Sequence, residues 1–204
     1  MAERLILGNV RLTIIDRVMT KEPLQGELKL KAYAIAPFRS HWVAFDMLFR
    51  ANGDGELEGK EFSVHERPIQ AGHGTHWQAK NLPVQWFGNA IGSPFSWFQS
   101  GEFDLEIEDS WSLAREQEVR SKWDLQFRDL KSAVPDDLPL KQKMLAVPIV
   151  AFLNRAPNPL PISFEITFDG NAFKGKASPE AVGLWQIIHD AANKALNAGR
   201  DPPQ

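Results

Sequence analysis

Cysteine is absent from this chain, tyrosine occurs once, and no long hydrophobic run is present. Without cysteine there is no disulfide framework, thiolate metal site, cysteine nucleophile or thiol redox switch. The longest apolar run, Met144 to Leu153, is interrupted by Pro148 and has about half of the roughly 20 residues that a membrane-spanning helix needs. The N-terminus carries Glu3 and Arg4 before an alternating pattern, unlike a secretory signal peptide. We therefore expect an excised part of a longer protein whose leader or anchor has been removed.

An excess of positive charge is also missing. The 204 residues include 23 Lys and Arg against 26 Asp and Glu, a formal net charge of −3. Binding to nucleic acid draws its free energy from clustered basic side chains, so we expect no nucleic-acid partner. Hydrophobic residues make up 43% of the chain, which is enough for a sizeable core.

The aromatic residues are unevenly distributed among the three types. The chain has 13 Phe and 7 Trp beside its single Tyr. Nearly every ring is therefore apolar or offers only one N–H donor. The composition is rich in hydrophobic rings and poor in polar groups attached to them.

Alternation of apolar and polar residues dominates the sequence and predicts strands with one buried face. The clearest examples are three segments in which apolar residues occupy every second position: Phe103, Leu105 and Ile107; Trp123, Leu125 and Phe127; and Ile162, Phe164, Ile166 and Phe168. Earlier segments show the same period at Val10, Leu12 and Ile14, at Leu28, Leu30, Ala32 and Ala34, and at Phe62 and Val64. Because such alternation is typical of sheets with one face in water, we predict a mainly β fold with few helices, a mostly antiparallel, curved, amphipathic sheet or groove of about eight strands.

Two further predictions concern residues 41–55. The segment His41 to Arg50 alternates through Phe45 and Met47 and is predicted to be a strand covered on both faces. The Asn-Gly and Asp-Gly steps of residues 52–55 favour positive φ angles and predict a tight hairpin.

Helices are few in the predicted fold. Ser178 and Pro179 form an N-cap and first-turn signal before a helical stripe of apolar residues, which predicts a C-terminal amphipathic helix over about 179–197. Residues 82–98 and 138–153 are apolar, contain prolines and lack a strict period, so each predicts a short or broken helix. Each of these two segments precedes a strand, which suggests a degenerate helix-then-strand repeat of about 60 residues. We expect one β-rich domain over 1–204, with a possible subdivision into an N-terminal sheet (1–80) and a repeat region (81–197), and a flexible tail (198–204).

Candidate catalytic and metal sites are weak. His73 and His76 have the spacing of two zinc ligands, but they lie in a Gly-rich segment without an intervening acid, so a solvated turn is the simpler interpretation. The acidic row Glu102, Asp104, Glu106, Glu108 and Asp109 could hold calcium or an acid–base pair, but it is more simply the solvated face of a strand. No nucleophile elbow, Walker loop or dinucleotide glycine signature is present. We therefore expect no enzyme activity, no cofactor and no metal.

Six aromatic residues gather between positions 77 and 98, namely Trp77, Trp86, Phe87, Phe95, Trp97 and Phe98. They either close the end of the β core or line an apolar cavity.

Three stretches of the sequence resemble one known family. The first runs from Asn81-Leu82-Pro83-Val84 to Phe95-Ser96-Trp97-Phe98 and on through Ser100-Gly101-Glu102-Phe103-Asp104-Leu105. The second is Trp123 to Lys131 followed by Leu138-Pro139-Leu140, and the third is Leu160-Pro161-Ile162 to Gly170-Asn171-Ala172-Phe173. Over about residues 80–197 this order resembles the AsmA-like bacterial envelope proteins, whose amphipathic strands close into an elongated groove.

The resemblance implies a periplasmic protein, associated with the inner membrane through an N-terminal helix, that holds or moves phospholipid. This chain lacks such a tether and is much shorter, which fits a C-terminal or isolated domain. Membrane contact would then come through a missing N-terminal anchor or a partner protein.

The residues themselves support the same function. One amphipathic helix cannot cover about eight strands, so part of the apolar face remains for a ligand such as a phospholipid acyl chain. The side chains expected to line this groove are Leu12, Ile14, Leu28, Leu30, Phe45, Met47, Phe103, Leu105, Ile107, Trp123, Leu125, Phe127, Phe164, Ile166 and Phe168. Two alternatives remain open: a structural or protein-interaction module with a closed core and no ligand, and a metal-dependent hydrolase built on His73 and His76.

Overall fold

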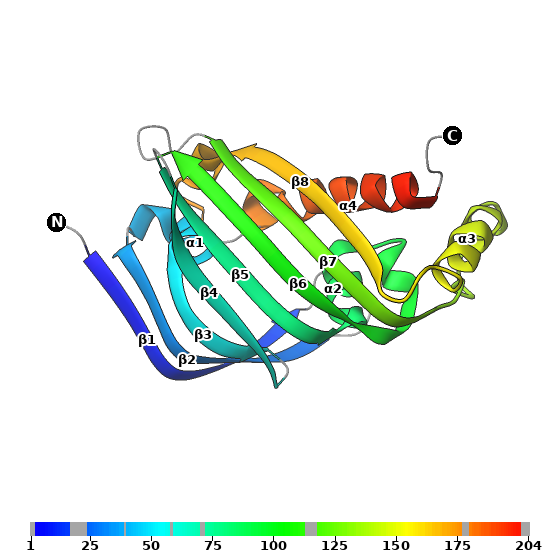
Figure 1. Ribbon diagram of the computed structural model, residues 1–204, viewed down its shortest axis with the longest axis horizontal. Helices are drawn as coiled ribbons and strands as arrows, with labels where there is room; N and C mark the ends of the chain where they lie inside the picture. The colour runs from blue at the N-terminus through cyan, green and yellow to red at the C-terminus, as the bar shows by residue number, and fades with distance from the viewer. Residues whose placement is uncertain are drawn as a thin grey trace.

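One antiparallel sheet of eight strands forms the body of the protein in the computed structural model, which describes residues 3–16, 24–38, 40–57, 59–69, 72–112, 118–176 and 180–200. The strands follow one another in sequence order across the sheet, and every neighbouring pair is antiparallel. The strands are β1 (Glu3–Asp16), β2 (Leu24–Phe38), β3 (Ala51–Leu57), β4 (Lys60–Ile69), β5 (Gly72–Pro83), β6 (Phe98–Ser112), β7 (Glu118–Ser132) and β8 (Leu160–Asp169). The predicted mainly β, mostly antiparallel class is confirmed, and strands from before and after residue 80 share one open sheet (Figure 1).

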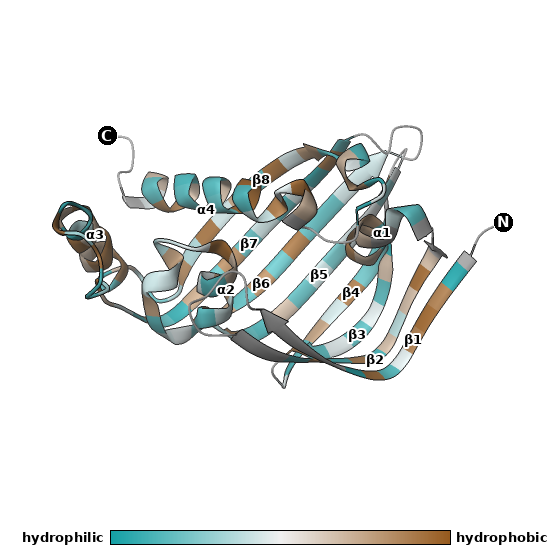
Figure 2. Ribbon diagram, turned by 180° about the vertical axis from the view of Figure 1, so that it is seen from behind, coloured by the Kyte–Doolittle hydropathy of each residue, from teal (hydrophilic) through white to brown (hydrophobic). Residues whose placement is uncertain are grey.

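Within the described residues, four α-helices accompany the sheet. They are α1 (Val43–Phe49), α2 (Val84–Ile91), α3 (Leu140–Leu153) and α4 (Leu184–Arg200), with short 3-10 turns η1 (Ser40–Trp42), η2 (Phe95–Trp97), η3 (Gly170–Phe173) and η4 (Glu180–Val182). Helices α1, α2 and α4 lie on one side of the sheet (Figure 2). We call this side the covered face and the opposite side the outer face.

The C-terminal helix is confirmed, with shifted ends. Helix α4 begins at Leu184 after the turn η4 and continues to Arg200, into the predicted tail 198–204. The predicted cap at Ser178 and Pro179 lies outside the described residues. Both proline-containing segments also form helices, α2 with η2 and α3 with Pro148 inside it. Because α2 connects β5 to β6 and α3 connects β7 to β8, both lie at the same end of an antiparallel sheet.

The strand predicted for His41 to Arg50 is wrong. These residues form η1 and α1, because Phe45 and Phe49, four residues apart, are both buried and both pack against Phe173. The apolar residues of this segment fit a period of two and a period of 3.6 equally well, and tertiary burial decides for the helix.

The hairpin predicted for residues 52–55 is also wrong, since these residues lie inside β3. Gly53 is required there because a Cβ on it would lie 1.9 Å from the carbonyl oxygen of Ala32 in the neighbouring strand. This close approach falls at the register shift between Leu30 and Ala32 of β2. The chain turns instead at Gly59, between β3 and β4, with a φ of 72°.

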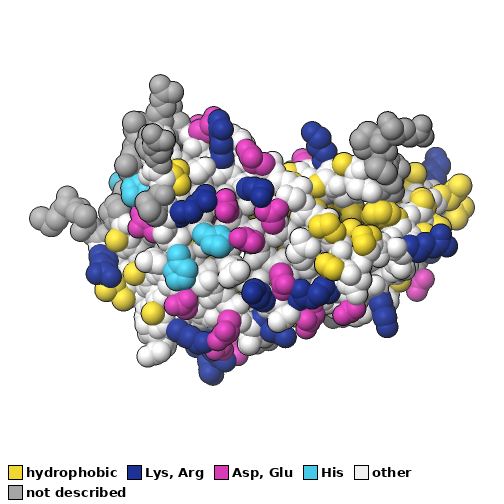
Figure 3. All heavy atoms as spheres, viewed as in Figure 1, with side chains coloured by type: hydrophobic (Ala, Val, Ile, Leu, Met, Phe, Trp, Pro, Cys, Tyr) yellow, Lys and Arg dark blue, Asp and Glu magenta, His cyan; other side chains and the backbone are white. Residues whose placement is uncertain are grey.

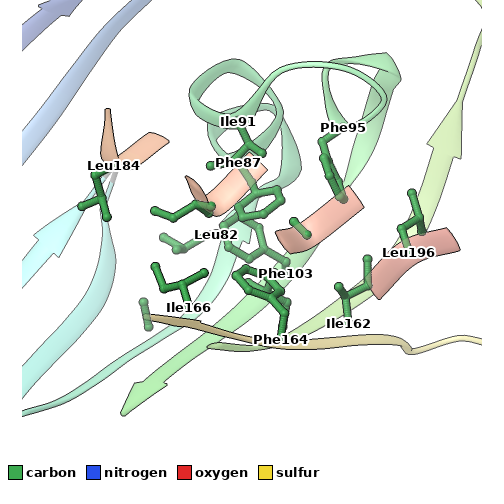
Figure 4. Packing of buried hydrophobic residues seen from close by; sticks show 14 of the residues in the cluster. Leu82, Phe87, Ile91, Phe95, Phe103, Ile162, Phe164, Ile166, Leu184 and Leu196 are labelled. Carbon is green, nitrogen blue, oxygen red and sulfur yellow. The ribbon is translucent and has the colours of Figure 1, made fainter. Parts of the chain in front are cut away.

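The covered face carries the core. A large cluster under α2 and α4 includes Phe87, Phe103 and Phe127, whose ring centroids lie 5.5–5.6 Å apart. Figure 4 shows Phe87 of α2 close to Phe103 and Phe164, with Leu184 and Leu196 of α4 to either side of them. A smaller cluster on β2–β4 consists of Leu30, Tyr33, Ile35, Ala51 and Val64.

The outer face is charged (Figure 3). Glu102, Asp104, Glu106 and Glu108 of β6 lie there, opposite the apolar row that begins at Phe103, as the alternation of a strand requires. Asp104 accepts two hydrogen bonds from Arg128, and these bonds lower the pKa of its carboxyl. Most of the acidic row is therefore the solvated face that the sequence predicted.

Candidate functional site: an apolar cavity on the covered face

An apolar cavity of about 370 Å³ lies between the two core clusters. Strands β1 to β8 form its floor, through side chains such as Leu30, Ala79 and Ile107. Helix α1, α2 and the first turns of α4 form its walls. Side chains of the large cluster and of the small cluster both line the cavity, which separates the two clusters.

The wall provided by α1 is fixed to the sheet by two side chains of the strands. The hydroxyl of Tyr33 donates a hydrogen bond to the main-chain oxygen of Met47 (2.9 Å), and the indole N–H of Trp77 donates one to that of Leu48 (3.0 Å). Both acceptors belong to the last turn of α1, where carbonyls have no partner within the helix. Burial also raises the pKa of the Tyr33 phenol, which keeps it in the donating form.

The side of the cavity over the N-terminal strands is less covered. Leu7, Leu28 and Leu57 line it and are only half-buried, whereas Leu184 and Ile188 of α4 are buried in the opposite wall. Helix α4 packs mainly on β8, which is the edge strand opposite β1. The more open side of the cavity therefore lies over β1–β3.

One acid lies in this apolar site. Asp109 was predicted to belong to the solvated acidic row, and this is wrong: it is 2% exposed, lies on the covered face in phase with Phe103 and Ile107, and lines the cavity. Asp109 is separated from Phe103 by an even number of positions along the strand, so both side chains point to the same face. In the sequence, Asp109 directly follows the alternating acids of the outer face and was therefore grouped with them.

Asp109 sits in a row of polar residues that crosses three strands. Thr75 of β5 and Ser121 of β7 are its direct neighbours in the sheet, and the Thr75 hydroxyl donates to Asp109 Oδ2 at 3.1 Å. Burial raises the pKa of the Asp109 carboxyl to about 7, although hydrogen bonds from Ser121 and Thr75 oppose that shift. Its Oδ1 atom has no hydrogen-bond partner among the described residues.

The structure brings together about half of the predicted groove residues. Eight line the cavity: Leu28, Leu30, Met47, Leu105, Ile107, Trp123, Ile166 and Phe168. Five are buried in the closed core beside it: Phe45, Phe103, Leu125, Phe127 and Phe164. The side chains of Leu12 and Ile14 lie outside the described residues.

Several lining residues were not predicted. Leu48, Phe49, Leu184, Trp185 and Ile188 come from helices, and their alignment with the strands depends on tertiary packing. Of the six aromatic residues between positions 77 and 98, Trp77 and Trp86 line the cavity, while Phe87, Phe95 and Phe98 are buried in the core. Both interpretations of that aromatic group are therefore correct for part of it.

The solvated turn preferred for His73 and His76 is wrong, since both residues lie in strand β5, and the two side chains of the alternative zinc pair do not come together. His73 stacks on Trp111 on the covered face and its Nδ1 lies 2.6 Å from Glu66 Oε1, whereas His76 Nε2 lies 2.8 Å from Glu106 on the outer face. Residues three apart in a strand point to opposite faces, which separates the two imidazoles. The described part of the chain contains no group of three His, Asp or Glu side chains placed to hold a metal ion.

A second hollow, of about 510 Å³, lies over β2–β5 and is polar. Two of the three lysines that line it are engaged, since Lys31 pairs with Glu56 and Glu61 and Lys60 pairs with Glu102. The apolar cavity is therefore the stronger candidate for a binding site.

Comparisons of the chain with protein-family models, with curated proteins and with solved structures return no match. Within the described residues, none of the helices combines the length and the apolar character needed to cross a bilayer.

Proposed function

We propose that this protein is a non-enzymatic lipid-binding or lipid-transfer domain whose apolar cavity holds an acyl chain. The observation that carries the proposal is the cavity of about 370 Å³, which is lined almost entirely by aliphatic and aromatic side chains. Its volume falls in the range typical of small-molecule sites. Each methylene buried in such a site stabilises the complex by about 0.8 kcal/mol.

The shape of the site suits a chain better than a compact ligand. The lining extends over strands from β1, at Leu7, to β8, at Ile166, so the cavity runs across the strands. When Asp109 is ionised, its carboxylate repels a second negative charge at the floor of the apolar cavity. The acyl part of the ligand therefore lies inside, and a phosphate head group stays at the open side near Leu28 and Leu57.

The wider identity belongs to the same proposal. The resemblance of residues 80–197 to AsmA-like envelope proteins is supported by one feature of the structure, the single sheet of amphipathic antiparallel strands with a C-terminal helix. On this basis the protein works in the periplasm on phospholipid, as a domain of an envelope protein associated with the inner membrane. The alternative, a structural module with a closed core, is disfavoured by the cavity.

A displacement titration tests the binding. The purified chain is titrated with a fluorescent fatty acid, and unlabelled phospholipid or fatty acid then competes for the site. We expect saturable binding with about one site per chain.

Two variants on β2 localise the site. Leu28→Trp replaces an aliphatic side chain with a bulky indole ring at the half-buried, open side of the cavity. It is expected to weaken binding of the fatty acid at least about tenfold. Lys29→Trp adds the same ring on the outer face and is the matched control. Absence of saturable binding, or equal affinities for the wild type and Leu28→Trp, contradicts the proposal.

A further inference from the structure

Helix α3 presents an apolar surface that nothing in the described chain covers. Leu140 is 76% exposed, Met144 and Leu145 are each 71% exposed, and Val147 is 56% exposed. These four residues are most of the large hydrophobic side chains that are exposed in the described residues. Hydrophobic atoms gather at the end of the molecule that carries α3 (Figure 3).

The opposite side of α3 packs against the protein. Ala146, Val150 and Leu153 are buried there. With apolar residues on its buried and its exposed sides, α3 has the composition of a helix surrounded by nonpolar material. Because α3 lies at the end of the sheet, the apolar residues on its outward side are exposed to water.

The base of α3 is held rigidly. Asn154, directly after the helix, donates its side-chain N–H to the carbonyl of Ser132 (2.9 Å) and accepts from the Ser132 amide (2.8 Å). Asn158 donates its side-chain N–H to the carboxylate of Asp129 on β7 (2.8 Å) and accepts from the Asp129 main-chain amide (3.3 Å). The exposed side of α3 is therefore presented in a fixed direction, beyond the end of β7.

The charge of this segment is positive. From Leu140 to Arg155 the sequence contains Lys141, Lys143 and Arg155 and neither Asp nor Glu, in a chain whose formal net charge is −3. Asp136 and Asp137 precede the helix. Basic side chains beside exposed aliphatic ones match an interface between anionic head groups and acyl chains.

We propose that α3 docks the protein on an anionic lipid bilayer, with Leu140, Met144, Leu145 and Val147 inserted at the head-group boundary. A protein partner is a poorer fit, because protein interfaces are anchored mainly by Trp, Tyr and Arg, and the exposed side of α3 offers aliphatic residues and methionine. This docking is independent of the acyl chain proposed for the cavity, since Leu28 and the exposed residues of α3 belong to separate surfaces.

Flotation with vesicles tests the docking. We expect the wild type to float with vesicles of phosphatidylglycerol and phosphatidylcholine. With phosphatidylcholine vesicles alone, the fraction of protein that floats should be at least about tenfold smaller. Lys141→Gln/Lys143→Gln is expected to weaken binding to the anionic vesicles about tenfold. Leu140→Gln/Met144→Gln/Leu145→Gln is expected to abolish it.

Ile6→Gln is the matched control, because Ile6 is an exposed apolar residue of β1, 63% exposed, away from α3. The Leu28→Trp variant separates the two proposals, since it is expected to lose ligand binding and keep flotation. Circular dichroism verifies that each variant is folded.

A labelling experiment gives a second readout. Because the chain has no cysteine, Met144→Cys offers a single site for an environment-sensitive dye, and Ile6→Cys offers a control site. We expect a blue shift at position 144 on anionic vesicles and none at position 6. Failure of the wild type to float, or a stable dimer that the Gln triple variant dissociates without any vesicle binding, overturns the proposal.

Discussion

The indole N–H of Trp77 on β5 donates a hydrogen bond to the main-chain oxygen of Leu48, 3.0 Å away in the last turn of α1. This bond and the one from Tyr33 to Met47 hold a seven-residue helix against the sheet. Such a short helix is marginal by itself. The wall of the cavity at α1 is therefore held by two polar contacts in addition to the buried rings of Phe45 and Phe49.

Trp77→Phe tests this attachment. The variant keeps an aromatic ring and removes the donor, so we expect a loss of about 1 kcal/mol in the free energy of unfolding. Amide hydrogen exchange should increase in residues 43–49 and stay unchanged in β7. Tyr33→Phe is the parallel variant and should act on the same residues. Unchanged exchange in α1 would show that other contacts position the helix.

Leu105 and Leu125 form a matched pair for testing the cavity. They are direct neighbours on β6 and β7 and lie on the same face, but Leu105 lines the cavity and Leu125 is 0% exposed in the closed core. Leu125→Ala should cost about 3 kcal/mol of stability, because it opens a new void. Leu105→Ala should cost about half as much, because it enlarges a space that already exists. Chemical denaturation measures both, and equal costs would contradict an open cavity beside Leu105.

Asp109→Asn tests the titration of the buried acid. Burial raises the pKa of Asp109 from its ordinary value of 3.8 to about 7, so the folded protein holds this proton more tightly than the unfolded chain. Its contribution to stability is therefore complete at low pH and is lost as pH rises towards 7. Relative to the wild type, the Asn variant should gain about 2 kcal/mol between pH 5 and pH 8. A difference that does not change with pH would show that Asp109 is ionised in the folded protein throughout.

Gly53→Ala tests the close approach of β2 and β3. The added Cβ would lie 1.9 Å from the Ala32 oxygen, so one strand must shift, at a cost of about 2–3 kcal/mol. Gly8→Ala is the control in β1, where the nearest atom to an added Cβ is 3.9 Å away. Thermal unfolding should separate the two variants clearly, and similar midpoints would contradict the register of this pair.

The sequence predicted the sheet well because its signal is local. Residues such as Phe103, Leu105 and Ile107 alternate with acids, and a strand with one wet face is the simplest structure that separates them. The C-terminal helix and the two proline-containing helices were predicted for similar reasons, from caps and from apolar segments.

The failures involve information that is not local. Phe45 and Phe49 fit a helix and a strand, and their packing against distant residues such as Phe173 of η3 and Trp111 of β6 distinguishes the two. Gly53 has the sequence context of a turn residue, but it is a glycine because the backbone of β2 lies too close for a side chain. The division between cavity and closed core depends on tertiary packing, since Leu105 lines the cavity and its neighbour Leu125 is buried beside it although both show the same alternation.

Native mass spectrometry of the protein, purified from cells without detergent, tests the central claim most directly. The account predicts a population heavier than the chain by the mass of one lipid, which Leu28→Trp depletes and Lys29→Trp retains, and a lipid in the solvent extract that matches the added mass. A spectrum with only the mass of the unliganded chain, for a protein that also fails to bind added fatty acid or phospholipid, would contradict it.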